Sequence, residues 1–195
     1  MSTCKVSERN FVMEKRITAP IDKETASELR AGDSVLISGV IYTARDAAHE
    51  RMTRLHKDGE PYPIDLNGQI IYYAGPCPAK PGEVIGSCGP TTAGRMDAYT
   101  PELLDNGLGA MIGKGARSQA VKDAIIRNKS VYFGAIGGAG ALIAGCIKKA
   151  EVVAYDDLGT EAIRRLEVED FPAVVLFDCV GGDLYEEGQK KFRHI

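Results

Sequence analysis

The chain has 195 residues, of which 44% are hydrophobic and 26% are charged, a composition typical of a soluble globular protein. This length suits one domain with a substantial core, or at most two small ones, and we expect residues 1–195 to form a single domain. The formal net charge of -3 provides no basic face for phosphates, which argues against nucleic acid as a partner. No stretch reaches the ~18 apolar residues that span a bilayer, and no early apolar run has signal-peptide length. We therefore expect a cytoplasmic protein without a membrane partner.

The cysteines are odd in number and scattered, and no two of them are spaced as C-x-x-C. This distribution argues against a disulfide framework, a zinc site of the usual spacing and a ferredoxin-type cluster. We expect reduced thiols that are mostly buried, and no metal held by this chain. The cysteines are Cys4, Cys77, Cys88, Cys146 and Cys179.

Short runs rich in β-formers alternate along the chain with runs that repeat at helical spacing. This alternation predicts an α/β layered domain with a mixed or mainly parallel sheet. Gly39 interrupts an early β-type run, which predicts a bulge there and, with the neighbouring β segments, a second small sheet. We interpret the end of the chain, 183–191, as a polar tail. Strands are expected at 16–21, 34–43, 69–74, 110–112, 130–133, 152–155 and 173–177. Helices are expected at 22–30, 44–57, 100–106, 117–128 and 159–165, and the stretch 134–146 is expected to form a turn that leads into a further helix.

The helix expected over 44–57 begins directly after a strand. Asp46 at its start complements the helix dipole and could cap the helix. Arg45 does not help the dipole, so its side chain faces either solvent or an anion. His49 and His56 fit the polar side of this helix, and a metal role for them has no support from nearby cysteine or carboxylate spacing.

The stretch 86–97, GSCGPTTAGRMD, contains three glycines between apolar segments. Glycine lets a ligand approach the main chain closely. The hydroxyls of Thr91 and Thr92 offer hydrogen bonds, and the guanidinium of Arg95 offers a fixed positive charge. The stretch is therefore a candidate site for an anionic small molecule, although an ordinary turn with a threonine cap fits the same residues.

Lys114 lies between two glycines, where a predicted strand passes into a predicted helix. This arrangement resembles an anion contact near a helix N-terminus. The P-loop spacing is absent, and the glycine-rich stretch 134–146 lacks the G-x-G-x-x-G pattern, because Ile143 stands where its third glycine belongs. The sequence therefore argues against nucleotide and dinucleotide binding.

Five segments carry a resemblance to a known family: YTARDAAH (42–49), YYAGP (72–76), PAKPGEVIG (78–86), GPTTAGRMD (89–97) and GKG (113–115). Taken in this order, they resemble the β subunit of class I, iron–sulfur fumarate hydratases and L(+)-tartrate dehydratases. In single-chain members of that family the same unit is the C-terminal domain. The resemblance runs from about Ile17 to Phe177 and implies a swivelling β/β/α layered domain.

The resemblance also implies a partner, an α subunit whose three cysteines hold a [4Fe–4S] cluster, with the active site between the two chains. It implies an α2β2 assembly and leaves a β–β homodimer open. The family's substrate contacts correspond to Arg45, Thr92, Arg95 and Lys114, and its proton-transfer residue corresponds to Thr91. A threonine hydroxyl is a weak base by itself, so neighbouring cations or a carboxylate of the partner must activate it.

The expected function is therefore half of a hydro-lyase that interconverts fumarate and (S)-malate and is active only with its α subunit. The same chemistry on L-tartrate, yielding oxaloacetate, is an alternative, because the two substrates differ by little and the cations suit either. A further alternative is a non-catalytic module that binds a dicarboxylate.

Overall fold

The computed structural model of the chain describes residues 14–136 and 138–193. Its strands are β1 (Lys15–Ala19), β2 (Ser34–Thr43), β3 (Ile70–Tyr72), β4 (Ala110–Gly113), β5 (Val131–Gly134), β6 (Ile147–Ala154) and β7 (Ile163–Phe177). Its helices are α1 (Lys23–Glu28), α2 (Asp46–Lys57), α3 (Thr100–Asp105), α4 (Gln119–Asn128), α5 (Gly140–Cys146) and α6 (Leu184–Phe192), with 3-10 turns η1 (Ala93–Met96) and η2 (Asp156–Glu161). None of these helices is long and apolar enough to cross a membrane.

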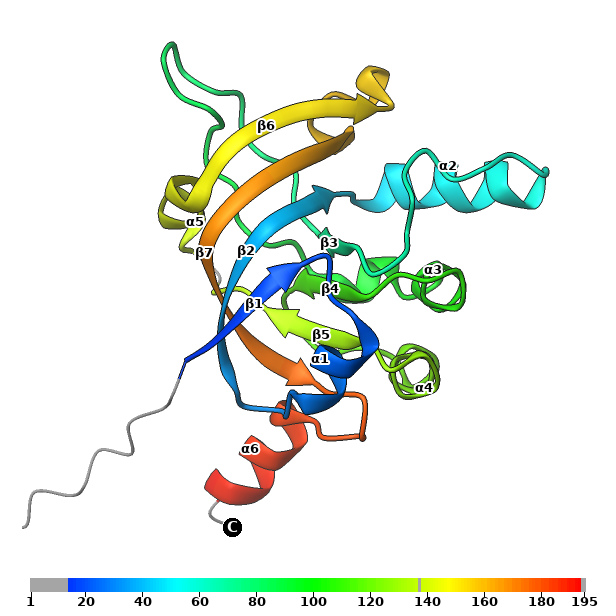
Figure 1. The fold of residues 1–195 in the computed structure, drawn as a ribbon, viewed down its shortest axis with the longest axis vertical. Helices are drawn as coiled ribbons and strands as arrows, with labels where there is room; N and C mark the ends of the chain where they lie inside the picture. The colour runs from blue at the N-terminus through cyan, green and yellow to red at the C-terminus, as the bar shows by residue number, and fades with distance from the viewer. Residues whose placement is uncertain (1–13, 137, 194–195) are drawn as a thin grey trace, which may run out of the picture.

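The strands form one seven-stranded mixed sheet that closes on itself (Figure 1). Strands β2, β3, β4 and β5 run parallel to one another, and β7 runs antiparallel to both β5 and β2. Because β7 bonds to β2 as well as to β5, these strands make a closed five-stranded barrel. Strand β1 pairs with β2, and β6 pairs with β7, outside the ring.

The predicted α/β class is confirmed, whereas the second small sheet is not, because the early strands β1 and β2 belong to the same sheet as the others. The bulge predicted at Gly39 is confirmed by a register shift between Ile37 and Gly39. Gly39 has a φ of 115°, and a Cβ there would run into the carbonyl oxygen of Ala19. The barrel does not test the swivelling β/β/α arrangement, which stays a prediction.

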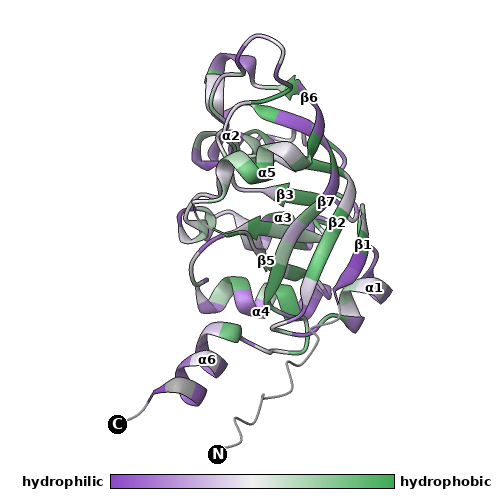
Figure 2. Cartoon of the chain, turned by 90° about the vertical axis from the view of Figure 1, so that its left-hand side faces the viewer, coloured by the Kyte–Doolittle hydropathy of each residue, from purple (hydrophilic) through white to green (hydrophobic). Residues whose placement is uncertain are grey.

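Alternate residues of the barrel strands face two separate hydrophobic clusters. In β3, Ile70 and Tyr72 belong to the cluster that also packs α1 and α5, while Ile71 belongs to the cluster beneath α2, α3 and α4. Every residue of β3, β4 and β5 is buried, as expected for parallel strands covered on both faces. Figure 2 shows hydrophobic colouring gathered on the barrel strands, while α6 is mostly hydrophilic.

The C-terminal part departs most from the sequence-based expectation. The helix predicted at 159–165 is wrong, because η2 ends at Glu161 and β7 then runs unbroken to Phe177. Pro172, which precedes the strand expected at 173–177, lies inside β7 opposite Leu36, beside the register shift. The polar tail is also wrong: 184–192 is a helix, capped by Asp183, whose carboxylate accepts from the backbone N–H groups of Tyr185 and Glu186 at 2.9 and 3.3 Å.

Candidate active site

The predicted site residues follow the carboxyl ends of neighbouring parallel strands, the edge where ligands bind in α/β sheets. Arg45 comes two residues after β2, and Lys114 comes directly after β4. Thr91 lies in the loop after β3, where its backbone N–H donates to the carbonyl of Tyr73 at 2.7 Å. One edge of the sheet therefore collects segments that are separate in the sequence.

Backbone hydrogen bonds join the Thr91 and Lys114 segments. The N–H of Lys114 donates to the carbonyl of Thr91 at 3.2 Å, and the N–H of Ala93 donates to the carbonyl of Lys114 at 2.9 Å, so that Thr92 and Lys114 form a parallel bridge. Gly113 permits this approach, because a Cβ there would lie 2.9 Å from the ring of Tyr73. Within the described residues, the Thr91 hydroxyl and the Lys114 ammonium make no hydrogen bond or ion pair, so both groups can serve a ligand.

Arg45 stands at the N-cap position of α2 with its side chain 20% exposed. It packs against Gly75, where a Cβ would lie 2.7 Å from Arg45 Nη1. The carboxylates of Asp46 and Glu161 each lie 3.6 Å from Arg45 Nη2, which is longer than a hydrogen bond. Arg45 Nε is buried without a hydrogen-bond partner among the described residues. The guanidinium therefore keeps unused donors that suit an anion.

Asp46 connects Arg45 to Arg95. Its Oδ1 lies 2.7 Å from Arg95 Nε, while its Oδ2 faces Arg45 Nη2. The expected cap is not made by Asp46: the N–H of Ala47 donates to Glu161 Oε2 at 2.9 Å, so a carboxylate from η2 caps α2. The sequence did not indicate this role of Asp46 or of Glu161, because both contacts depend on segments that only folding brings together.

A buried arginine, Arg117, joins two of the segments that form this edge. The Arg117 side chain is 1% exposed, and its Nε pairs with Asp97 Oδ1 at 2.6 Å. Its Nη2 donates to the hydroxyl of Thr100 at 2.8 Å, and its guanidinium lies over the rings of Tyr73 and Tyr132, 5.3 and 4.9 Å from their centroids. This network fixes the loop after Lys114 to the segment after η1. No local pattern marked these residues, because each one resembles an ordinary surface or core residue.

His49 is completely buried, which corrects its predicted place on the polar side of α2. Its Nδ1 donates to the carbonyl of Arg45 at 2.9 Å, and its ring packs edge-on against Tyr73. His49 Nε2 has no hydrogen-bond partner among the described residues. Desolvation disfavours the imidazolium and lowers the pKa of His49 to about 4, so the side chain is neutral at pH 7. His49 therefore supports the backbone of Arg45 instead of binding substrate.

Acidification should lower the free energy of unfolding partly through His49. Because the folded-state pKa of about 4 lies below the ordinary value of 6.5, the stabilisation is fully present above pH 6.5 and is lost as the pH falls toward 4. Between pH 7 and pH 5 this loss is about 2 kcal/mol. Urea unfolding at both pH values measures it, with His49→Gln as the control that cannot titrate. Equal losses in the two proteins would contradict this assignment.

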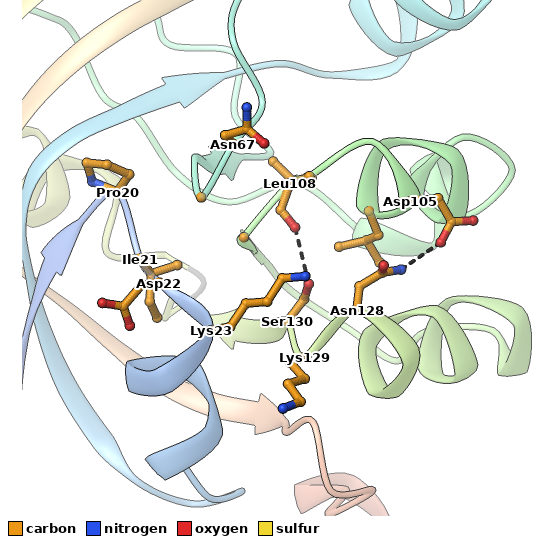
Figure 3. A pocket seen from close by; sticks show the side chains of 14 residues that line it. Pro20, Ile21, Asp22, Lys23, Asn67, Asp105, Leu108, Asn128, Lys129 and Ser130 are labelled. Atoms are coloured by element: carbon orange, nitrogen blue, oxygen red, sulfur yellow. Dashed lines mark hydrogen bonds between the residues drawn. The ribbon is translucent and has the colours of Figure 1, made fainter.

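A cavity of about 430 Å³ lies at the opposite, amino edge of the strands (Figure 3). It is lined by Gly68 before β3, Gly109 before β4 and Ser130 before β5. Its charged residues are of both signs, and none of the predicted site residues lines it. We therefore place the candidate site at the carboxyl edge, where the predicted site residues lie, and not in this cavity.

Sequence comparison decides the family, because the family described as "Fumarase C-terminus" matches residues 3–188. The chain belongs to the fumarase C-terminus family. It is 44% identical over 155 residues to "Fumarate hydratase class I, aerobic" of Escherichia coli (strain K12), a match that covers 78% of this chain and 28% of that protein. It is 41% identical over 173 residues to "Fumarate hydratase 2" of Leishmania major, covering 86% of this chain and 30% of that protein.

Another relative is about as long as this chain, and the match covers most of both proteins. "Putative L(+)-tartrate dehydratase subunit beta" of Methanocaldococcus jannaschii is 38% identical over 177 residues, a match that covers 88% of this chain and 91% of that protein. The chain thus spans less than a third of the two fumarate hydratases and nearly all of the subunit-sized relative. The predicted family membership is confirmed at this level, and homology to hydro-lyases follows from it. The roles of Arg45, Thr91, Thr92, Arg95 and Lys114 stay predictions.

Proposed function

We propose that the chain is the β subunit of an iron–sulfur-dependent hydro-lyase that interconverts fumarate and (S)-malate by reversible hydration. The observation that supports this most is the joining of two arginines through Asp46, at the sheet edge where Thr91 and Lys114 also lie. A dicarboxylate needs fixed cations, and this edge supplies three. The proposal includes activity only together with an α subunit, in an α2β2 assembly in the cytoplasm, and a swivelling β/β/α domain. A β–β contact within that assembly is left open.

The reaction explains why these residue types suit the site. Removing a proton from the carbon next to a carboxylate places a second negative charge on that carboxylate in the transition state. Arg45 and Arg95 would bind it through planar, paired donors, and Lys114 would act as a compact point charge. Fixed cations that meet developing charge in this way each contribute about 3 kcal/mol to transition-state stabilisation. Thr91 would hold and transfer the proton, with its hydroxyl activated by these cations or by a carboxylate of the α subunit.

The described part of the chain does not fit the ligand set of an iron–sulfur cluster. Cys77 is exposed, Cys146 is half-buried, and Cys88 and Cys179 are buried, while Cys4 lies outside the described residues. Residues 14–136 and 138–193 contain no group of three or more His, Cys, Asp or Glu side chains that could hold a metal ion. We therefore assign the [4Fe–4S] cluster to the α subunit. When bound there, the cluster supplies a Lewis acid for the hydroxyl that leaves or enters.

L-Tartrate is the second candidate substrate, favoured by the near full-length match to a protein named as a tartrate dehydratase β subunit. Tartrate carries one more hydroxyl than malate, and the same cations would bind its carboxylates.

The test is anaerobic reconstitution of the chain with its α subunit, identified by pull-down. We expect fumarate absorbance to fall on addition of the complex and to stay constant with the chain alone. A parallel assay of oxaloacetate from L-tartrate decides between the substrates by kcat/KM. If the complex carried a loaded cluster and were inactive with both substrates, the proposed hydro-lyase activity would be refuted. Tight dicarboxylate binding by the isolated chain would then favour a non-catalytic binding module.

A further inference from the structure

We propose that Asp46 is a positioning residue that holds Arg45 and Arg95 in the orientation needed for one carboxylate. This inference rests on the proposed function, because it treats both arginines as substrate contacts. Asp46 itself would not touch the substrate. It would act through the two guanidiniums that it joins.

Arg95 depends on Asp46 for its orientation. Its side chain is 55% exposed and leaves the short turn η1, which by itself fixes little of a long side chain. Within the described residues, Arg95 makes one ion pair, between its Nε and Asp46 Oδ1 at 2.7 Å. An arginine without such an anchor loses considerable side-chain entropy when it binds a ligand. The anchor removes part of that cost before the substrate arrives.

Asp46 is available for this role because another carboxylate, that of Glu161, caps helix α2. An acidic residue in the first turn of a helix commonly accepts from the free backbone N–H groups. Here Glu161 accepts from the N–H of Ala47 at 2.9 Å. Asp46 Oδ2 is buried and has no hydrogen-bond partner among the described residues, although it faces Arg45 Nη2 at 3.6 Å. The side chain of Asp46 is therefore directed at the arginines and not at its own helix.

The charges make the arrangement necessary. Two guanidiniums that approach one ligand repel each other when the ligand is absent. A carboxylate between them offsets this repulsion and keeps both side chains near the same place. The opposite role is also conceivable on electrostatic grounds: Asp46 could compete with the substrate carboxylate for the arginines. The two roles predict opposite changes in KM when the charge is removed, so one variant separates them.

The decisive variant is Asp46→Asn, which keeps the shape and removes the charge. In the reconstituted complex we expect KM for the dicarboxylate to rise and kcat/KM to fall by about tenfold to a hundredfold. Combining it with Arg95→Ala should cost less than the product of the two separate losses, because both variants remove the same interaction. A fall in KM, an unchanged kcat/KM or fully multiplicative losses would overturn the proposal.

Asp157→Asn is the matched control. Asp157 on η2 accepts from Arg51 on α2 through two contacts of 2.7 Å, so the control likewise removes a carboxylate charge that pairs with an arginine, but one other than Arg45 and Arg95. We expect its kcat/KM to equal that of the wild type. Thermal unfolding of each variant shows whether it is folded.

A readout that needs no turnover uses the full chain alone. The ¹⁵N–¹H signals of the arginine Nε groups, assigned with Arg45→Lys and Arg95→Lys, report the local partner of each guanidinium. We expect the Arg95 signal to shift and exchange faster in Asp46→Asn, and to stay unchanged in Asp157→Asn. An unaltered Arg95 signal in Asp46→Asn would overturn the proposal. If the wild-type complex were inactive, the proposed function would fail, and these signals would still decide whether Asp46 holds the arginine.

Discussion

Thr91→Val should lower kcat of the reconstituted enzyme by about 10²–10⁴-fold, the usual contribution of a positioned proton-transfer group. Valine has nearly the shape of threonine, so the loop that pairs with Tyr73 and Lys114 should keep its backbone hydrogen bonds. The variant removes a hydroxyl that has no hydrogen bond within the described residues, so it leaves no buried donor without a partner. KM should therefore change by less than about threefold. Steady-state kinetics with fumarate and with malate measure both constants.

The adjacent residue provides the comparison. Thr92 forms the backbone bridge to Lys114 and lies next to Thr91. Its predicted role is substrate binding and not proton transfer. Thr92→Val should raise KM more than it lowers kcat, the reverse of the expected pattern for Thr91→Val. If Thr91→Val kept wild-type turnover while Thr92→Val lost it, the two roles would have to be exchanged.

Features set by neighbouring residues could be predicted from the sequence. The helix expected at 22–30 corresponds to α1, at whose start Asp22 accepts from the N–H of Thr25 at 2.7 Å, and the bulge lies at Gly39 as expected, because capping and positive φ are local properties. The closure of the barrel could not be predicted, since it requires β2 to pair with β7 from the far end of the chain. The same pairing draws 163–172 into a strand, although a helix was predicted over 159–165.

The site shows the same division. The residue types and their positions made Arg95 and Lys114 candidate anion contacts and left Arg45 open between solvent and an anion, and the roles of all three stay predictions. The carboxylates that orient the arginines could not be predicted, because Asp46 reads as an ordinary first-turn acid and Glu161 fell in a stretch read as helix. His49 shows a further limit: helical spacing places it next to polar residues, but burial against Tyr73 and the bond to the Arg45 carbonyl decide its environment. Tertiary packing, which no short pattern contains, determined each of these cases.

Arg117→Met should lower the free energy of unfolding by about 3–5 kcal/mol, the cost of removing one member of a buried ion pair. Arg117 is 1% exposed, and the carboxylate of Asp97 that it neutralises is 16% exposed, so the variant would leave a poorly hydrated charge. The backbone N–H of Ser118 would still donate to Asp97 Oδ2 at 2.6 Å, but a single N–H cannot replace a guanidinium. Urea unfolding at pH 7 measures the loss.

Two further variants separate the buried charge from the lost packing. Arg127→Met breaks an exposed pair in which two donors reach Asp105 at 2.9 and 2.8 Å, and it should cost at most about 1 kcal/mol. Arg117→Met combined with Asp97→Asn removes the stranded charge while an amide oxygen still accepts from Ser118, so it should recover part of the stability lost in Arg117→Met. If Arg117→Met lowered the free energy of unfolding by no more than Arg127→Met does, the buried Arg117–Asp97 pair would not hold the loop after Lys114 against the segment after η1. The rigidity of the candidate site would then have to come from the backbone bonds between Thr91 and Lys114.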